Sequence, residues 1–186
     1  MRKNFGAKTW LYPMPVLIVS AYDDKGVANC MNAAWGGIAE ENQIMICLDD
    51  KHKTTKNIEY SKAFTVSVGT AKTVVQCDYV GVVSGNKELN KMGKANFTTT
   101  KSNFVNAPII NELPYTLECE LISYDVNSCM LLGKIVNVSA DDSVLDSNGV
   151  VDVRKLEPIT YDPVNHTYIK LGDVVGKAFS DGLKLK

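Results

Sequence analysis

Alternation of apolar and polar residues recurs along the chain and is typical of half-buried β-strands. The clearest instance is A-F-T-V-S-V at residues 63–68. This and similar β-rich segments predict strands at residues 16–22, 27–35, 43–48, 63–68, 115–124, 129–138 and 167–171. Asp23–Gly26 has the turn chemistry of a hairpin between the first two strands. Gly133 predicts a bulge within the strand at 129–138.

Apolar residues at helical spacing lie between these strands. They predict short helices at residues 53–62, 73–83 and 87–94, and a partly helical connector around 151–156. In the second helix, Val74, Val75, Tyr79 and Val82 are spaced for one buried stripe. Strands in hairpin-like succession favour a closed antiparallel barrel over a doubly wound parallel sheet. The expected fold is mainly β with short helices, in a single domain over residues 1–186.

One predicted strand differs from the others in composition. Val27 to Glu40 reads V-A-N-C-M-N-A-A-W-G-G-I-A-E and consists mostly of small side chains, whereas a core strand would use bulkier β-branched residues. Small side chains let the backbone approach a flat ligand, and Gly36-Gly37 lacks Cβ atoms where another chain or a ligand comes close. Burial in the core is the alternative interpretation for Trp35.

A candidate anion site follows this strand in sequence. The strand at 43–48 runs into D-D-K-H-K-T-T-K-N-I, which predicts a helix start carrying Lys53, Thr54 and Thr55. Helix N-termini bind anions through free N–H groups and the helix dipole. A site for a planar ring followed by a site for a phosphate points to FMN. The alternative is a solvated helix start capped by threonine, and the carboxylates of Asp49-Asp50 count against a nearby phosphate.

Composition and charge narrow the function classes. Apolar residues make up 45% of the chain and charged residues 22%, which is an ordinary globular balance. The net charge of −1 argues against binding to nucleic acid or to an anionic membrane, because either would need a basic face. No apolar run reaches the ~18 residues of a membrane span. The first residues lack the apolar region of a secretory signal, so the cytoplasm is the expected location.

Cysteine and histidine usage gives no metal site. The five cysteines are scattered without a C-x-x-C, and their odd number predicts reduced thiols that serve as small core residues. Cys30 stands apart because it lies in the small-residue strand. His52 and His166 are the only histidines, and no Cys/His cluster has ligand spacing. The chain also lacks a dinucleotide-binding glycine motif and a P-loop.

A series of short segments, in order along almost the whole chain, resembles the flavin reductase-like family with the FMN-binding split barrel, and within it the flavoredoxin type. The segments are P-M-P-V-L-I-V (13–19), N-C-M-N-A-A-W-G-G (29–37), H-K-T-T-K-N-I (52–58), A-F-T-V-S-V (63–68), D-Y-V-G-V-V-S-G (78–85), N-A-P (106–108), L-E-C (117–119), G-K-I (133–135), P-I-T-Y (158–161) and Y-I-K-L-G-D-V-V-G-K-A-F (168–179). Their order and spacing, more than any single segment, carry the resemblance.

The resemblance implies an antiparallel, Greek-key-like split β-barrel that forms a homodimer and binds FMN near the subunit interface. It implies that the strand at 29–35 lines the flavin ring and ribityl chain, that 48–54 holds the ribityl chain and phosphate, and that the turn at 84–85 lies near the cofactor. The cofactor-binding residues that it suggests are Asn29, Cys30, Met31, Asn32, Ala33, Ala34, Trp35, Leu48, Asp49, His52, Lys53, Thr54, Ser84, Lys91 and Tyr168.

The expected function is that of an FMN-dependent oxidoreductase or electron-transfer protein, with NAD(P)H or a redox protein as electron donor. A flavin carries the redox chemistry itself, so no catalytic acid or base is assigned. A NAD(P)H-dependent flavin reductase is the alternative. Ser128 stands where many such reductases carry a histidine, and Lys134 and Asn90 replace acidic residues, which disfavours direct NAD(P)H use. A flavin-free barrel that binds oligonucleotides is a remote alternative, because it would need a basic groove with aromatic residues.

Overall fold

The structure is a computed structural model that describes all residues from 1 to 186. Its strands are β1 (Met14–Pro15), β2 (Leu17–Tyr22), β3 (Ala28–Ala33), β4 (Gly36–Glu40), β5 (Gln43–Cys47), β6 (Ala63–Val68), β7 (Thr99–Lys101), β8 (Pro108–Ile110), β9 (Tyr115–Asp125), β10 (Met130–Ala140), β11 (Ile159–Asp162) and β12 (Thr167–Lys170). The α-helices are α1 (Lys53–Ser61), α2 (Val74–Val82), α3 (Lys91–Lys94) and α4 (Val153–Leu156). Three short 3₁₀ helices are η1 (Ala71–Thr73), η2 (Asp142–Val144) and η3 (Asp181–Leu185). None of the helices is long and apolar enough to cross a membrane.

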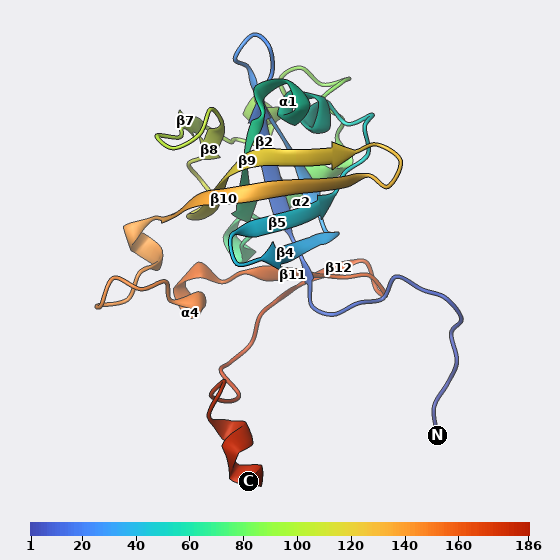
Figure 1. Ribbon diagram of the computed structural model, residues 1–186, viewed down its shortest axis with the longest axis vertical. Coiled ribbons are helices and arrows are strands. Elements are labelled where there is room, and N and C mark those ends of the chain that lie inside the picture. Colours follow the sequence, from blue (N-terminus) through green and yellow to red (C-terminus); the bar gives the residue numbers. More distant parts are fainter.

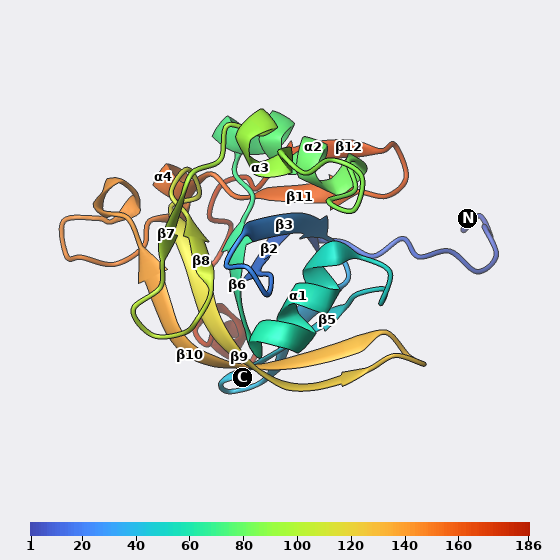
Figure 2. The same ribbon diagram turned by 90° about the horizontal axis from the view of Figure 1, so that it is seen from above.

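Seven strands form one antiparallel sheet in the order β3-β2-β6-β9-β10-β5-β4. The sheet curls into an incomplete barrel, and α1 lies in its open side, packed on β2, β3 and β6 (Figures 1 and 2). Apolar side chains from β2, β5 and β6, among them Val19, Ile46 and Phe64, fill the interior together with Ile58 of α1. The predicted mainly β, antiparallel split-barrel fold is therefore confirmed.

The predicted bulge at Gly133 is also confirmed. The register between β9 and β10 shifts between Leu132 and Gly133. A Cβ atom at position 133 would lie 2.3 Å from Cζ of Phe64. Glycine is needed here because the Phe64 ring fills the barrel interior directly against the β10 backbone.

A second core lies on the outer face of β2 and β3, under α2 and α3 (Figure 2). Cys77 and Val80 of α2 are its fully buried contributions, whereas Val75 and Val82 are exposed. The predicted stripe is confirmed for Val74 and Tyr79, which pack against this core, and wrong for Val75 and Val82. The sequence V-V-Q-C-D-Y-V-G-V has apolar residues around most of the helix, so spacing alone could not select the face that packs on β3.

Three further segments differ from the expectation. β4 forms an unpredicted edge strand, antiparallel to β5. The predicted helix at 87–94 is reduced to α3, because residues before it form turns. β11 follows the predicted connector and was not predicted as a strand, and it pairs with both β1 and β12 in a separate three-stranded sheet. These pairings join segments far apart in the chain, which local patterns do not encode.

The two ends of the chain extend from the body. The N-terminal arm projects from the body (Figures 1 and 2), and the Tyr12 hydroxyl donates a hydrogen bond to Asp162 just before β1. The C-terminal segment leaves β12 at Leu171 and projects away from the sheets (Figure 1). Every residue from Leu171 to Phe179 is exposed.

Candidate functional site

β3 turns its side chains alternately to the two cores. Met31 and Ala33 pack with the barrel interior, and Cys30 belongs to the core under α2. The Asn32 amide faces the same side as Cys30 and donates from Nδ2 to the Cys77 carbonyl of α2 at 3.1 Å. The middle of the predicted flavin strand is thus covered by protein on both faces, which leaves its two ends for a ligand.

At the first end, Asn29 ties β3 to the start of α1. Its Nδ2 donates to Oγ1 of Thr54 at 2.7 Å, and both side chains are buried. A Cβ atom at Gly85 would lie only 2.3 Å from Oδ1 of Asn29, so the turn after α2 also presses on this amide. Asn86 of the same turn donates from Nδ2 to the Lys51 carbonyl at 2.8 Å. The structure therefore brings the predicted residues Asn29 and Thr54 together beside the turn that contains Ser84, whose own side chain is exposed.

The start of α1 has free backbone donors. His52 is the N-cap residue and makes no side-chain capping bond, so the predicted threonine cap is not observed. Its carbonyl accepts the Lys56 amide at 3.3 Å. The backbone N–H groups of residues 53–55 make no hydrogen bond, which leaves three donors and the positive end of the helix dipole for an anion.

The Lys53 ammonium, predicted as a phosphate ligand, lies 3.3 Å from Oδ2 of Asp23 in the β2–β3 turn. Oδ1 of Asp23 accepts the amides of Lys25 and Val27 at 3.0 and 2.8 Å. Burial raises the pKa of Asp23, but these backbone bonds and the Lys53 ammonium bring it below its usual value. The sequence interpretation gave Asp23 only a role in the turn, because its ion pair with Lys53 joins residues 30 positions apart.

The loop before α1 is shaped by its own hydrogen bonds. Leu48 is fully buried, and its carbonyl accepts the Tyr124 hydroxyl at 2.7 Å. Oδ1 of Asp49 accepts the Lys51 amide at 2.8 Å, and the Asp49 carbonyl accepts the Thr55 hydroxyl at 2.8 Å. The Asp49 carboxylate is therefore engaged by its own loop, and the Thr55 hydroxyl is not free for a ligand.

A buried ammonium lies against the middle of β3. Lys91 is 3% exposed, and its Nζ donates to the Cys30 carbonyl at 2.8 Å. It has no carboxylate partner. Burial lowers the pKa of Lys91 and raises the pKa of the Cys30 thiol to about 12, so the thiol does not balance the charge. A positive charge kept under protein without a carboxylate suits an anionic ligand.

At its other end, β3 leads to a corner before β4 where Trp35 is 56% exposed. The alternative that Trp35 is a core residue was therefore wrong. Ala34 and Trp35 line an apolar groove of about 650 Å³. Its other lining residues are Lys8, Thr9, Trp10, Leu11, Pro13, Met14, Pro15, Gly36, Gly37, Ile38, Met45 and Cys47. We name this hollow the Trp10–Trp35 groove.

The close approach predicted at Gly36 involves the protein itself. A Cβ atom there would lie 2.9 Å from the Met45 carbonyl, whereas one at Gly37 would meet nothing within 4 Å. Gly36 lets β4 pass close to β5, and Gly37 leaves the backbone open on the groove side.

Tyr168 lies apart from these features. Its hydroxyl donates to Oδ1 of Asp78 on α2 at 2.8 Å, and its ring centroid is 6.0 Å from that of Tyr161. Tyr168 thus connects the three-stranded sheet to α2, and the same helix accepts the Asn32 amide through its Cys77 carbonyl.

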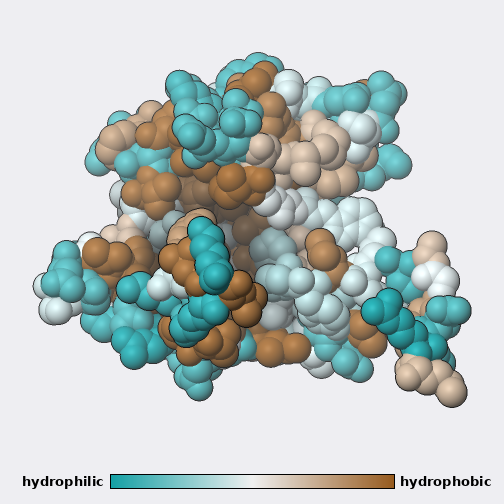
Figure 3. Space-filling view, turned by 60° about the horizontal axis from the view of Figure 1, so that its bottom comes forward, coloured by the Kyte–Doolittle hydropathy of each residue, from teal (hydrophilic) through white to brown (hydrophobic).

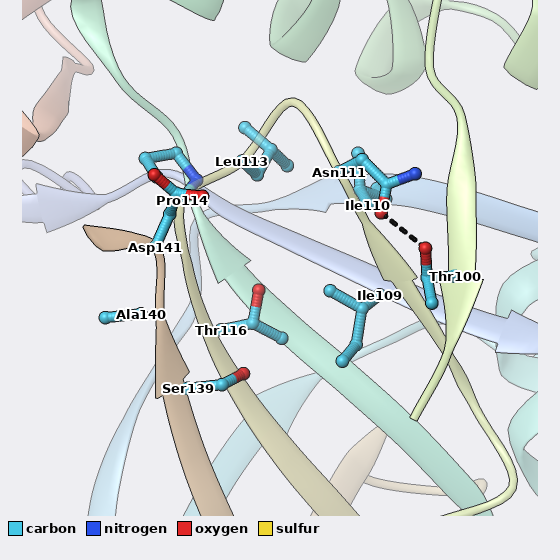
Figure 4. A pocket seen from close by; sticks show the side chains of 10 residues that line it. All are labelled: Thr100, Ile109, Ile110, Asn111, Leu113, Pro114, Thr116, Ser139, Ala140 and Asp141. Carbon is cyan, nitrogen blue, oxygen red and sulfur yellow. Dashed lines mark hydrogen bonds between the residues drawn. The ribbon is translucent and has the colours of Figure 1, made fainter. Parts of the chain in front are cut away.

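A separate hollow of about 380 Å³ lies beside β8, β9 and β10 (Figure 4). Its polar side chains bond to protein neighbours, as Thr100 does to Asn111 at 2.8 Å and Thr116 to Ser67 at 2.8 Å. It contains no cation and none of the predicted cofactor residues, so it is not the candidate site.

Solved structures share this fold closely. The flavoredoxin of Desulfovibrio vulgaris (Miyazaki F) is 34% identical, with a TM-score of 0.93 over 98% of this chain and 100% of that chain. The flavoredoxin from Methanosarcina acetivorans is 25% identical, with a TM-score of 0.89 over the full length of both chains. An uncharacterised protein of Aquifex aeolicus is 26% identical over an alignment of 161 residues, with a coverage of 79% for each chain.

The family described as "Flavin reductase like domain" matches residues 9–162, a span that includes both ends of β3, the start of α1 and Lys91. The chain therefore belongs to the flavin reductase-like family.

Proposed function

We propose that this protein binds FMN along β3 and acts as a flavin-dependent oxidoreductase or electron carrier of the flavoredoxin type. The observation that carries the proposal is the buried Lys91 ammonium, bonded to the backbone of β3 with no carboxylate to balance it. The Lys91 ammonium lies against β3, the strand that runs from the free N–H groups of α1 to the Trp10–Trp35 groove. Two structural neighbours, from Shewanella baltica and Thermus thermophilus, are described as FMN-binding, which supports a flavin ligand.

The start of α1 would hold the phosphate end. The free N–H groups of residues 53–55 and the Lys53 ammonium offer hydrogen bonds and positive charge to one anion. Asn29 and Thr54 fix the position of this helix start against β3. Asp23 fixes the Lys53 side chain beforehand, which lowers the entropy lost when a phosphate is bound.

The far end of β3 would hold the ring end of the cofactor. When bound, FMN supplies the electron-accepting and electron-donating chemistry. At this end the chain supplies the exposed Trp35 ring and the open backbone at Gly37, and the Lys91 ammonium lies against the middle of the strand. A buried cation near the ligand stabilises negative charge more strongly than it would in water, because the local dielectric is low.

The first test is the identity of the bound ligand. The purified protein should be yellow and should contain about one FMN per chain, because a hydrogen-bonded, partly preformed site retains its ligand. Heat release followed by chromatography distinguishes FMN from FAD and riboflavin. A colourless protein that does not take up added FMN would contradict the proposed cofactor.

We also propose that two copies of the chain associate. β4 is an edge strand with an exposed Ile38, and the Trp10–Trp35 groove beside it is largely apolar. Exposed apolar edges of this kind are usually covered by another chain. Sedimentation should give the mass of a homodimer, and a monomer mass with FMN tightly bound would exclude a site that needs both copies.

A further inference from the structure

The C-terminal tail, Gly172–Lys186, is an apolar arm that touches little of its own chain. Val175 and Phe179 are fully exposed, and Val174 and Leu185 are largely exposed. The tail runs away from the sheets (Figure 1). Large apolar side chains at such exposure are unfavourable in water, so this arrangement is suited to contact with another surface.

The tail has local structure of its own. Oδ2 of Asp181 accepts the Lys177 amide at 2.6 Å, and Oδ1 of Asp181 binds the Lys184 ammonium at 2.8 Å. Residues 181–185 form the 3₁₀ helix η3. The Asp181 bonds close a turn directly after Phe179, so the arm presents its apolar side chains on a partly ordered segment.

The Trp10–Trp35 groove borders the three-stranded sheet that carries the root of this arm. The tail follows β12, which pairs with β11, and β11 pairs with β1. Both residues of β1, Met14 and Pro15, line the groove. Figure 3 looks onto the side from which the tail projects and shows hydrophobic surface gathered around a hollow.

We propose that the tail of one copy lies in the Trp10–Trp35 groove of a second copy, and that the exchange is reciprocal. Each chain carries both the arm and the groove, and the arm starts on the sheet that borders its own groove but projects away from it. A two-fold axis through this region brings each arm to the other copy's groove and closes the assembly at two chains. The inference rests on the proposed dimer but does not depend on FMN.

This exchange would make the second copy part of the ligand site. Trp35 and Ala34 stand at the corner after β3, so an arm lying in the groove covers the end of that strand. Val175 and Phe179 of one copy would then exclude water from the Trp35 ring of the other.

The two tryptophans of the chain give a direct readout, because both of them line the groove. The flavin-free protein is compared with its Val175→Asp and Phe179→Asp variants by sedimentation and by iodide quenching of tryptophan emission. Each variant should raise the dimer dissociation constant roughly 10-fold or more, because a charge replaces a buried apolar side chain. Each should also make the tryptophans more accessible to iodide.

Val150→Asp is the matched control, because Val150 is an exposed valine in the turn after Asn148, outside the groove and the tail. It should leave both the mass and the quenching unchanged. A wild-type monomer would overturn both the dimer and the tail exchange. A dimer whose mass and quenching are unaffected by both tail variants would overturn the tail exchange alone.

Trypsin gives an independent check at Lys177, which lies between the two apolar tail residues. Cleavage after Lys177 should be slow in the wild-type dimer and fast in Val175→Asp at the same concentration. Rapid cleavage of the wild-type tail without loss of dimer mass would contradict the proposal. Flavin absorbance is measured separately, so a protein without FMN leaves this result interpretable.

Discussion

Lys53 stands between two anions, the carboxylate it contacts and the phosphate we assign to it. The Lys53–Asp23 pair is partly exposed, so its own contribution to stability is small. The value of the pair is geometric: it holds the ammonium beside three backbone N–H groups. Residues of this kind are tested best by comparing two ligands that differ only in the phosphate.

Lys53→Ala should weaken FMN binding much more than riboflavin binding. A charged hydrogen bond to phosphate is worth about 1.5–3 kcal/mol, or roughly 10- to 150-fold in affinity. Lys56→Ala is the control, because Lys56 is exposed on the same helix beyond the free N–H groups. Titration of both flavins by fluorescence measures the difference. Equal losses for FMN and riboflavin would show that Lys53 does not touch the phosphate.

Lys91→Met should stabilise the flavin-free protein at neutral pH by about 1–3 kcal/mol, because it removes a buried ammonium that has a single acceptor. Burial lowers the pKa of Lys91 in the folded state. The cost of the ammonium is therefore fully present below that lowered pKa, and it disappears as the pH rises toward the unfolded value of about 10.4.

The stability difference between Lys91→Met and wild type should accordingly shrink as the pH is raised from 7 to about 10. Urea unfolding at both pH values measures it, with Lys94→Met as an exposed control on the same short helix. The variant should also bind FMN more weakly. A variant that is less stable than wild type at pH 7 would mean that the ammonium stabilises the empty fold.

Among the elements, the contact of β3, α1 and the turn after α2 is the structural centre of the candidate site. Buried Asn29 bonds to α1 on one side and meets Gly85 on the other. Because the bonded amide has no room to move, a change in the turn should be transmitted to the start of α1.

Gly85→Ala tests this contact. Its added Cβ would force Asn29 away from Thr54, at a cost of about 1–3 kcal/mol in the free energy of unfolding. The variant should also bind FMN more weakly, because loss of the Asn29–Thr54 bond would move the free N–H groups of α1 away from β3. Gly37→Ala is the stability control, because its Cβ would meet nothing within 4 Å. Thermal unfolding gives the comparison, and equal stability of both variants would show that the turn adapts freely.

For the molecule as a whole, the residues around the candidate site bear on which donor would reduce a bound flavin. Ser128 lies in the β9–β10 turn, where its Oγ donates to Oδ2 of Asp125 at 2.8 Å. The only arginines are Arg2 and Arg154, and neither lies near β3 in sequence or lines the Trp10–Trp35 groove. Arginine is the usual partner of the 2′-phosphate of NADP, although lysine can also serve.

We therefore predict that NADPH reduces the bound flavin slowly and that a reduced redox protein does so faster. Anaerobic mixing with NADH, NADPH and a reduced ferredoxin, followed by flavin absorbance, compares the donors. Fast bleaching by either nicotinamide at micromolar concentration would favour the alternative of a NAD(P)H-dependent flavin reductase.

Local patterns were sufficient for most of the barrel. Alternation located β5, β6, β9 and β10, and small residues with two glycines singled out β3 and the corner after it. These features depend on neighbours within a few residues, since a strand needs one apolar face and a bulge needs a glycine. The free N–H groups at the α1 start could be predicted for the same reason, because they depend on the helix end itself.

Other features depend on contacts between distant segments. The exposure of Trp35, the ion pair of Lys53 with Asp23 and the burial of Lys91 under β3 join residues that the chain separates widely. The buried face of α2 was only partly predicted, because apolar residues surround that helix and only its packing on β3 selects Cys77 and Val80. Hydrophobic periodicity and secondary-structure propensity indicate which face of a segment can be buried. The curl of the sheet determines which other segments that face contacts.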